Sequence, residues 1–321
     1  MHLALHMYDD SDEILTLARQ LGATHFLAFT RLPDPNGYFE FADLLRFRKR
    51  VESFGLELGG VVLPRDHYVK AIYGLPGRDE QLDNCCTTIR NVGKAGIPTI
   101  GYDFSVAWVW GHWRNGRAGG GRGGAGLISF DYDLVKDAPI HPLGRVGGEE
   151  MWERFAYFLK RVVPVAEEAG VVLGCHPDDP PAPELRGTAR ILSTVEGMKR
   201  QIETVPSDSN AILFCQGTVA EMAGVGPKVV DVIRYFGSRN KIAYVHFRNV
   251  RGSFPKWDET FGDDGDVDML EAMRAYKEVG YKGLLIPDHS PVVVGDENGY
   301  RFRGMAYALG YMRGLMQAVG A

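Results

Sequence analysis

Residues 171–181 read Val-Val-Leu-Gly-Cys-His-Pro-Asp-Asp-Pro-Pro, a short apolar run followed by a histidine, two aspartates and three prolines. The short apolar run suits a strand that is buried on both faces, as in a parallel sheet. Proline cannot continue the hydrogen-bonded ladder of a sheet, so the strand must end near His176. The stretch therefore predicts an imidazole at the carboxyl end of a strand, followed directly by the carboxylates of Asp178 and Asp179.

On both sides of this stretch, strand-like and helix-like segments alternate. Apolar runs predict eight strands, at residues 3–7, 25–29, 57–63, 98–101, 171–176, 211–215, 241–246 and 283–287. Amphipathic segments, several of them followed by glycine, predict helices at residues 12–21, 41–54, 81–95, 149–169, 191–205, 228–236, 268–279 and 304–319. This alternation indicates an α/β fold with a single domain over residues 1–321, a (β/α)8 or TIM barrel. A doubly wound sheet also alternates, but residues 8–11 lack the glycines of a dinucleotide-binding turn.

An insertion interrupts the pattern after the fourth strand, at about residues 103–148. Residues 107–113 read Ala-Trp-Val-Trp-Gly-His-Trp, and residues 119–126 read Gly-Gly-Gly-Arg-Gly-Gly-Ala-Gly. The glycines lack the Gly-Lys-Ser/Thr ending of a phosphate-binding loop, which argues against nucleotide binding. We expect an irregular segment that serves as a mobile lid or a subunit contact. A disordered tip without a role is the alternative.

The composition excludes several classes of protein. Of the 321 residues, 45% are hydrophobic and 24% are charged, and the net charge is −5, which argues against a general binder of nucleic acid or anionic membranes. No apolar stretch approaches the roughly 20 residues of a membrane span, and the N-terminus lacks the pattern of a signal peptide. The four cysteines form neither a disulfide framework nor a C-x-x-C zinc pair. We expect a cytoplasmic homo-oligomer that acts on a small molecule.

Four consecutive predicted strands end in residues that can bind a metal ion: His176, Cys215, His246 and Asp288. A barrel gathers its strand ends around one mouth, so these side chains can converge although they are far apart in sequence. Taken singly, each histidine could be an ordinary hydrogen-bonded polar group, and Cys215 a small buried hydrophobe. The equivalent positions on adjacent strands favour the metal site. By donor chemistry, Zn2+ or Fe2+ would suit this set at least as well as Mn2+.

The same residues carry a resemblance to a known family. His-Pro-Asp-Asp-Pro-Pro at 176–181, Phe-Cys at 214–215, Val-His-Phe-Arg at 245–248, Gly-Asp-Val-Asp-Met at 265–269 and Pro-Asp-His at 287–289 resemble, in order and spacing, the mannonate dehydratase family. The first block is fairly specific, and the likeness extends over most of the chain. The sequence departs from the family at residues 30–33, Thr-Arg-Leu-Pro, where paired histidines commonly precede the proline.

The resemblance implies a metal-dependent dehydratase that converts D-mannonate into 2-keto-3-deoxy-D-gluconate and water, with Mn2+ as the usual metal. It assigns the metal ligands to His176, Cys215, His246 and Asp288. It assigns catalytic positions to His289 and Tyr300, and our hypothesis is that Tyr300 is the base and His289 the acid. Arg248 would hold the substrate carboxylate. Further substrate contacts are expected from Tyr8, Arg31 and Asp178.

Other functions stay open at this point. A metal-dependent sugar isomerase or epimerase of the xylose-isomerase-like type also gathers ligands at strand ends, but Cys215 in the site favours the dehydratase. A metal-dependent endonuclease on a similar barrel is disfavoured by the net charge of −5. A barrel that only binds a sugar acid would not need proton-transfer groups. Asp178 and Asp179 could orient a metal ligand or bind substrate hydroxyls, or could simply cap their own loop.

Overall fold

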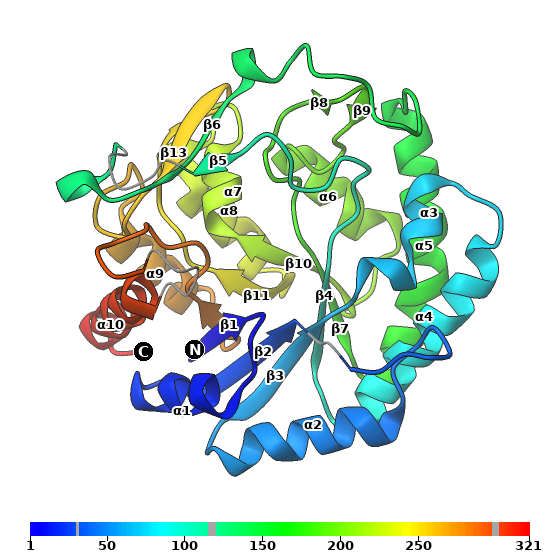
Figure 1. Ribbon diagram of the computed structural model, residues 1–321, viewed down its shortest axis with the longest axis horizontal. Coiled ribbons are helices and arrows are strands. Elements are labelled where there is room, and N and C mark those ends of the chain that lie inside the picture. Colours follow the sequence, from blue (N-terminus) through cyan, green and yellow to red (C-terminus); the bar gives the residue numbers. More distant parts are fainter. Residues whose placement is uncertain (30–31, 115–119, 297–301) are drawn as a thin grey trace.

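Eight parallel strands close into a barrel in the computed structural model, which describes residues 1–29, 32–114, 120–296 and 302–321 (Figure 1). The barrel closes because β1 pairs with β2 on one side and with β14 on the other. The strands are β1 (His2–Met7), β2 (His25–Phe29), β3 (Glu57–Val62), β4 (Thr99–Tyr102), β7 (Val172–Cys175), β10 (Asn210–Cys215), β11 (Ile242–His246) and β14 (Leu284–Ile286). The predicted single barrel is confirmed, with each strand within two residues of its expected ends.

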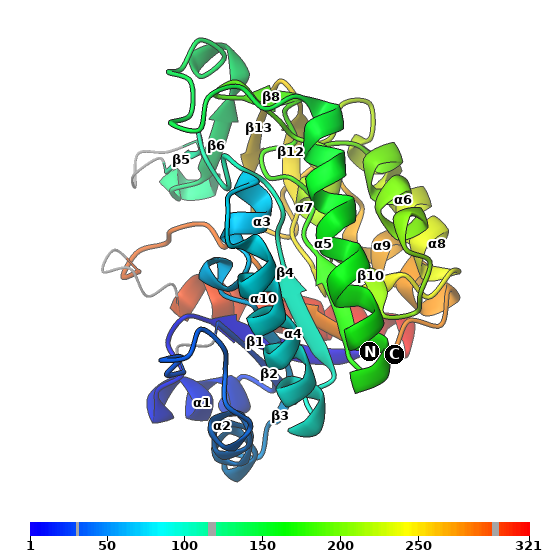
Figure 2. The ribbon, with the colours of Figure 1, turned by 90° about the vertical axis from the view of Figure 1, so that its right-hand side faces the viewer.

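Helices surround the barrel, and the two chain ends lie close together in both views (Figures 1 and 2). The α-helices are α1 (Asp12–Gln20), α2 (Phe41–Ser53), α3 (Val69–Tyr73), α4 (Arg78–Lys94), α5 (Gly148–Ala169), α6 (Val195–Thr204), α7 (Gln216–Glu221), α8 (Val229–Gly237), α9 (Met269–Glu278) and α10 (Phe302–Val319). Short 3-10 helices are η1 (Arg65–His67), η2 (Arg122–Gly124), η3 (Tyr132–Leu134) and η4 (Gly226–Lys228). Within the described ranges, no helix combines the length and apolar character needed to cross a membrane.

A second, antiparallel sheet lies at the end of the barrel where the strands have their carboxyl ends (Figure 2). It comprises β5 (Trp113–Arg114), β6 (Ile128–Asp131), β12 (Val250–Ser253) and β13 (Lys256–Glu259); β8 (Glu184–Leu185) and β9 (Thr188–Ala189) form a separate hairpin. The insertion, expected to be irregular, therefore contributes two strands, β5 and β6, to this sheet. Strand β6 pairs with β13, more than a hundred residues away, and the buried rings of Phe130 and Trp257 stack at 4.4 Å. Such a distant pairing leaves no local signal.

Alternation along the barrel strands divides the core into two parts. On β1, Leu3 and Leu5 pack with the core that faces the helices, whereas Ala4 faces the barrel interior. Tyr244 of β11 is fully buried in that interior. Its phenol packs against the backbone of Gly101 on β4, where a methyl group would overlap the hydroxyl. The barrel is thus filled with side chains directly below its carboxyl end.

We expect Gly101→Ala to destabilise the protein by about 1–3 kcal/mol, because the new methyl group must displace the rigid Tyr244 ring in a filled core. Denaturant unfolding would measure the loss. Gly310→Ala is the control, since Gly310 lies in α10 with open space around it and should be neutral or slightly stabilising. Equal stability of the Gly101 variant and the wild type would contradict this packing.

Candidate active site

A cavity of about 380 Å3 opens at the carboxyl end of the barrel strands. Its volume lies in the range of small-molecule sites, and in parallel barrels this end is the one that carries the chemistry. The polar side chains that line it include His6, Arg65, His176, His246, Asp288 and His289.

Three predicted metal ligands converge in this region. His176 directly follows β7, whereas Cys215 and His246 are the last residues of β10 and β11 and face each other in the register. One ligand atom from each of the three lies within 4.8 Å of the others. Nδ1 of His176 donates to the carbonyl of Pro177 at 2.6 Å, which leaves its Nε2 lone pair available. Neither ring nitrogen of His246 has a hydrogen-bond partner among the described residues.

Asp288, the fourth predicted ligand, lies beside two of these three. Its carboxylate oxygens are 3.5 Å from Nδ1 of His246 and 3.6 Å from Sγ of Cys215. Burial disfavours the ionised form of Asp288, but His289, His246 and Arg248 outweigh it and hold its pKa well below the usual range. Burial also lowers the pKa of His246 to about 4, so that the ring is neutral at pH 7. Both protonation states are those that a divalent cation requires.

Arg248 lies just after β11, as predicted, but its contacts differ from the expected ones. Its guanidinium is fully buried, and its terminal nitrogens contact Glu221 at 3.1 Å, Asp179 at 3.2 Å and Glu259. Nε lies 3.5 Å from the carboxylate of Asp288. The predicted grip on the substrate carboxylate does not match this position, because both terminal nitrogens already have protein partners. Arg248 instead holds together the carboxylates of Asp179, Glu221 and Glu259 beside the predicted metal ligands.

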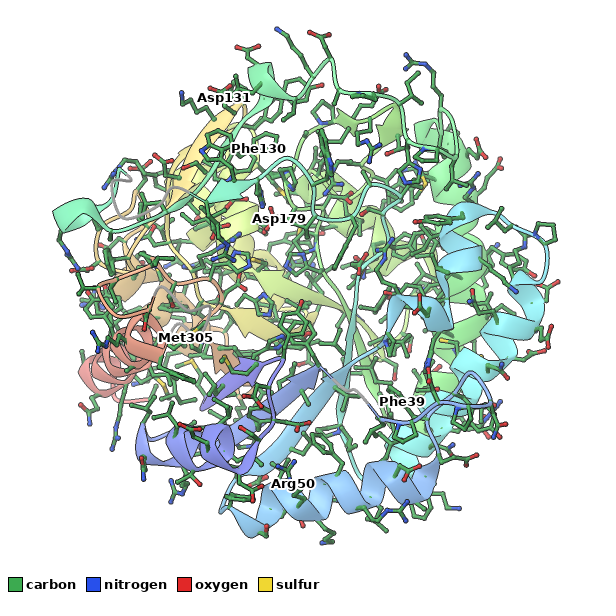
Figure 3. All side chains as sticks on the ribbon, viewed as in Figure 1. Phe39, Arg50, Phe130, Asp131, Asp179 and Met305 are labelled. Atoms are coloured by element: carbon green, nitrogen blue, oxygen red, sulfur yellow. The ribbon has the colours of Figure 1, made fainter. Side chains whose placement is uncertain are left out.

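The two aspartates after His176 have separate contacts. Asp178 lines the cavity, and its carboxylate accepts from the backbone N–H of Leu192 at 2.7 Å, so it also fastens its own loop. Asp179, labelled near the centre of Figure 3, accepts from the Thr218 hydroxyl at 2.9 Å. The same hydroxyl is 3.1 Å from Sγ of Cys215. Of the alternatives left open for this pair, the loop role fits Asp178 and support of a ligand fits Asp179.

His289 forms a close pair with Glu259, a residue that sequence reasoning missed. Nδ1 of His289 is 2.8 Å from a carboxylate oxygen of Glu259 and 2.9 Å from a terminal nitrogen of Arg248. Burial opposes protonation of the ring, but Asp288 and Glu259 outweigh it and raise the pKa of His289 to about 9. In the protonated ring, Nδ1–H donates to Glu259. Glu259 reaches the site from β13 of the second sheet, which no local pattern in the sequence indicates.

Of the other predicted substrate-binding and catalytic residues, the structure describes Tyr8 but not Arg31 or Tyr300. Tyr8 follows β1, lines the cavity and stacks on Phe29 at 3.9 Å. Arg31 and Tyr300 lie outside the described residues, so their roles stay predictions. Sequence reasoning also overlooked His6 and Arg65, which line the cavity. Both lie at the carboxyl ends of strands, β1 and β3, so the rule that singled out the predicted metal ligands could also have singled out these two residues.

The sequence model of the D-mannonate dehydratase (UxuA) family matches residues 1–147 and 141–321 of this chain. The chain belongs to this family. It is therefore a hydro-lyase, and the resemblance read from the sequence blocks is confirmed.

Relatives and solved structures agree with the family. The mannonate dehydratase of Thermotoga maritima is 28% identical, with 99% of this chain and 98% of the relative covered. That of Enterococcus faecalis is 32% identical, with coverage of 89% and 88%. The crystal structure of mannonate dehydratase from Streptococcus suis matches with a TM-score of 0.85 at 28% identity, covering 100% of this chain and 96% of that one. A D-psicose 3-epimerase from Clostridium cellulolyticum, at 14% identity and a TM-score of 0.64 with coverage of 98% and 99%, shares the fold alone.

Proposed function

We propose that this hydro-lyase dehydrates D-mannonate to 2-keto-3-deoxy-D-gluconate with a bound divalent metal ion. The observation that carries the proposal is the cluster of His176, Cys215 and His246, whose ligand atoms lie within 4.8 Å of one another at a cavity sized for a small molecule. Membership of the D-mannonate dehydratase family supports the substrate. The epimerase alternative has in its favour only a shared fold.

The donor set fits a divalent metal. The unpartnered nitrogens of His246 and the thiol of Cys215 face the same point, and Asp288 adds a carboxylate beside them. These residues and His176 would hold the ion, which when bound would act as a Lewis acid towards the substrate oxygens. We propose Mn2+ because of the family resemblance. On chemical grounds Zn2+ and Fe2+ would bind this site at least as well, because a thiolate ligand favours softer ions.

His289 is suited to act as the acid. The reaction removes the proton on C2 and the hydroxyl group on C3, and the enol that results becomes the 2-keto acid by taking up a proton at C3. A protonated His289 would give its proton to the departing hydroxyl group, which leaves as water. Glu259 stabilises that protonated ring and fixes its orientation through the 2.8 Å contact. The base in this proposal is Tyr300.

The substrate carboxylate requires a cationic partner, and Arg248 is fully buried and already engaged. Arg65 and Arg190 line the cavity, but Arg65 is paired with Asp103 and Arg190 with Asp178. Neither is freer than Arg248, so we propose no arginine for this contact. Cytoplasmic location and assembly into a homo-oligomer stay predictions; four unpaired cysteines fit a reducing compartment.

We expect Glu259→Gln to lower kcat/KM by roughly tenfold or more at pH 8, because the hydrogen bond from the protonated His289 loses its charged acceptor. The pKa of His289 should fall, since Glu259 is one of the two carboxylates that raise it. An acid works only while protonated, so the alkaline limb of the pH–rate profile should move to lower pH. Asp258→Asn is the control, because Asp258 lies on the same strand but contacts Ser129. An unmoved alkaline limb would rule out this role for Glu259.

A keto-acid assay on metal-stripped protein tests the function itself. We expect product from D-mannonate on resupply of Mn2+, with Zn2+ and Fe2+ as comparison metals and other aldonates as comparison substrates. Tyr300→Phe should lose turnover. Tyr307→Phe should not, because Tyr307 is a surface residue of α10 with 38% of its area exposed. Unchanged turnover in Tyr300→Phe would refute its role as base. Tight metal binding without keto acid from any aldonate would refute the dehydratase proposal.

A further inference from the structure

Exposed apolar side chains form part of the rim of the cavity. Eight large apolar side chains of the described residues are exposed, and three of them, Tyr8, Trp108 and Val109, line this one cavity. Exposed apolar side chains that gather at one place mark a contact surface. Trp108 is the largest of the three, and half of its surface is exposed.

The backbone of Trp108 is held in an unfavourable conformation. Its φ of 51° lies in the left-handed region, where side chains other than glycine are strained. Glycine would adopt this backbone conformation without strain, so the presence of tryptophan here points to a role for its side chain. Strain of this kind persists only where the surroundings enforce it, and it concentrates at ligand sites.

Two arginines enforce the position of Trp108. A terminal nitrogen of the buried Arg190 donates to the Trp108 carbonyl at 2.9 Å, and Nε of Arg190 donates to the carbonyl of Pro180 at 2.8 Å. Arg65 donates to the carbonyl of Ser105 at 2.8 Å, and its guanidinium lies 5.7 Å from the Trp108 ring. The segment that carries Trp108 is therefore tied to the loop after β7, which begins with a metal ligand, and to the end of β3.

The residues that precede Trp108 are packed in the core. Phe104 is buried and stacks on Phe155 of α5 at 4.7 Å, and Val106 is buried as well. The chain thus leaves the core only at the rim. There it presents an indole ring that is fixed at its backbone but free over much of its surface.

We propose that Trp108 is a specificity-determining residue, whose ring packs against the end of the substrate carbon chain that points away from the metal ligands. The proposal rests on the proposed function, in which C2 and C3 react beside the metal ligands and His289. The far end, C5 and C6, would then reach the rim. An indole face covers the C–H groups of such a chain and excludes water from them.

The test compares D-mannonate with D-lyxonate, which has the same configuration at C2, C3 and C4 but lacks C6. In the wild type, kcat/KM should favour D-mannonate. Trp108→Ala should reduce this preference by about 5- to 10-fold, and Trp108→Phe should retain most of it. Trp108→Leu makes the same comparison if the alanine variant does not fold. Trp110→Ala is the matched control, since Trp110 belongs to the same segment but does not line the cavity.

A second measurement, of thermal stability, distinguishes the effect of losing the indole ring from the effect of the backbone strain. Trp108→Gly should melt at a higher temperature than Trp108→Ala, by roughly 1–3 °C, because glycine relieves the left-handed strain. Both variants should show the same loss of preference between the two aldonates, because both lack the ring. If Trp108 had only a structural role, the preference for D-mannonate would be lost more in the less stable of the two variants.

The outcomes are distinguishable. An active wild type with an unchanged preference in Trp108→Ala overturns the inference and leaves the proposed function intact. A wild type that produces no keto acid from either aldonate overturns the proposed function and the inference with it. A reduced preference in Trp108→Ala and Trp108→Gly, retained in Trp108→Phe and Trp110→Ala, supports the inference.

Discussion

Replacing Cys215 with alanine is expected to remove the bound metal and to lower kcat/KM for D-mannonate by about 10^3-fold or more. Cys215 supplies the only sulfur in the donor cluster that the described residues form, and it faces His246 across two paired strands. A Lewis-acid metal contributes several kcal/mol to such a reaction, and each 1.4 kcal/mol corresponds to a factor of ten. Metal content by elemental analysis and the keto-acid assay would measure the two losses together.

Cys85→Ala provides the matched control. Cys85 is as fully buried as Cys215, but it lies in α4 and takes no part in the donor cluster. The control variant should keep its metal and its activity, with only a small loss of stability from the missing sulfur atom. Full metal occupancy in Cys215→Ala would show that the thiol is not a ligand. Full occupancy without activity would give Cys215 a role in the reaction alone.

Arg248→Leu is expected to lower the free energy of unfolding by about 3–5 kcal/mol, a decrease in Tm of roughly 5–15 °C. The guanidinium is fully buried among Asp179, Glu221, Glu259 and Asp288. Its removal leaves these carboxylates buried without their shared cation. Burial already raises the pKa of Glu221 well above its usual range, although Arg248 opposes this shift, and without the arginine further proton uptake is expected. Calorimetry on metal-free protein would measure the loss.

Arg234→Leu is the control for this experiment. Arg234 also contacts three carboxylates, those of Asp231, Glu271 and Glu278, but 40% of its side chain is exposed. Water and salt screen such a cluster, so its loss should cost no more than about 1 kcal/mol. Similar losses of stability in the two variants would mean that burial does not determine how much the Arg248 cluster contributes to the free energy of unfolding. A more stable Arg248→Leu would mean that the buried charges are a net cost to the fold.

Local sequence patterns were sufficient for the barrel strands and for the donor residues that converge at their carboxyl ends. An apolar run buried on both faces, closed by proline or a polar side chain, marks a barrel strand and its carboxyl end within a few residues. The stretch ending in His176 shows this, since β7 spans Val172–Cys175 and the imidazole follows directly. Cys215 and His246 are recognised in the same way, because each ends a strand that its own apolar run marks.

The residues that contact these donor residues and His289 were not predictable in this way. Glu259 reaches His289 from β13, and β13 has its place only because it pairs with β6 of the insertion. Arg248 lies two residues after a predicted strand, so its location was visible. Its role was not, because four carboxylates from separate segments surround it.

The sequence by itself therefore determined the α/β barrel, its strand ends and the identity of the residues at its mouth. Each of these depends on the burial and hydrogen bonding of a few consecutive residues. The tertiary structure alone decided which of these residues are free to meet a ligand and which are already paired. It placed Arg248 behind the site, brought Glu259 to His289 and fixed Trp108 over the cavity. These outcomes depend on distances between segments far apart in the chain, and no local pattern encodes such distances.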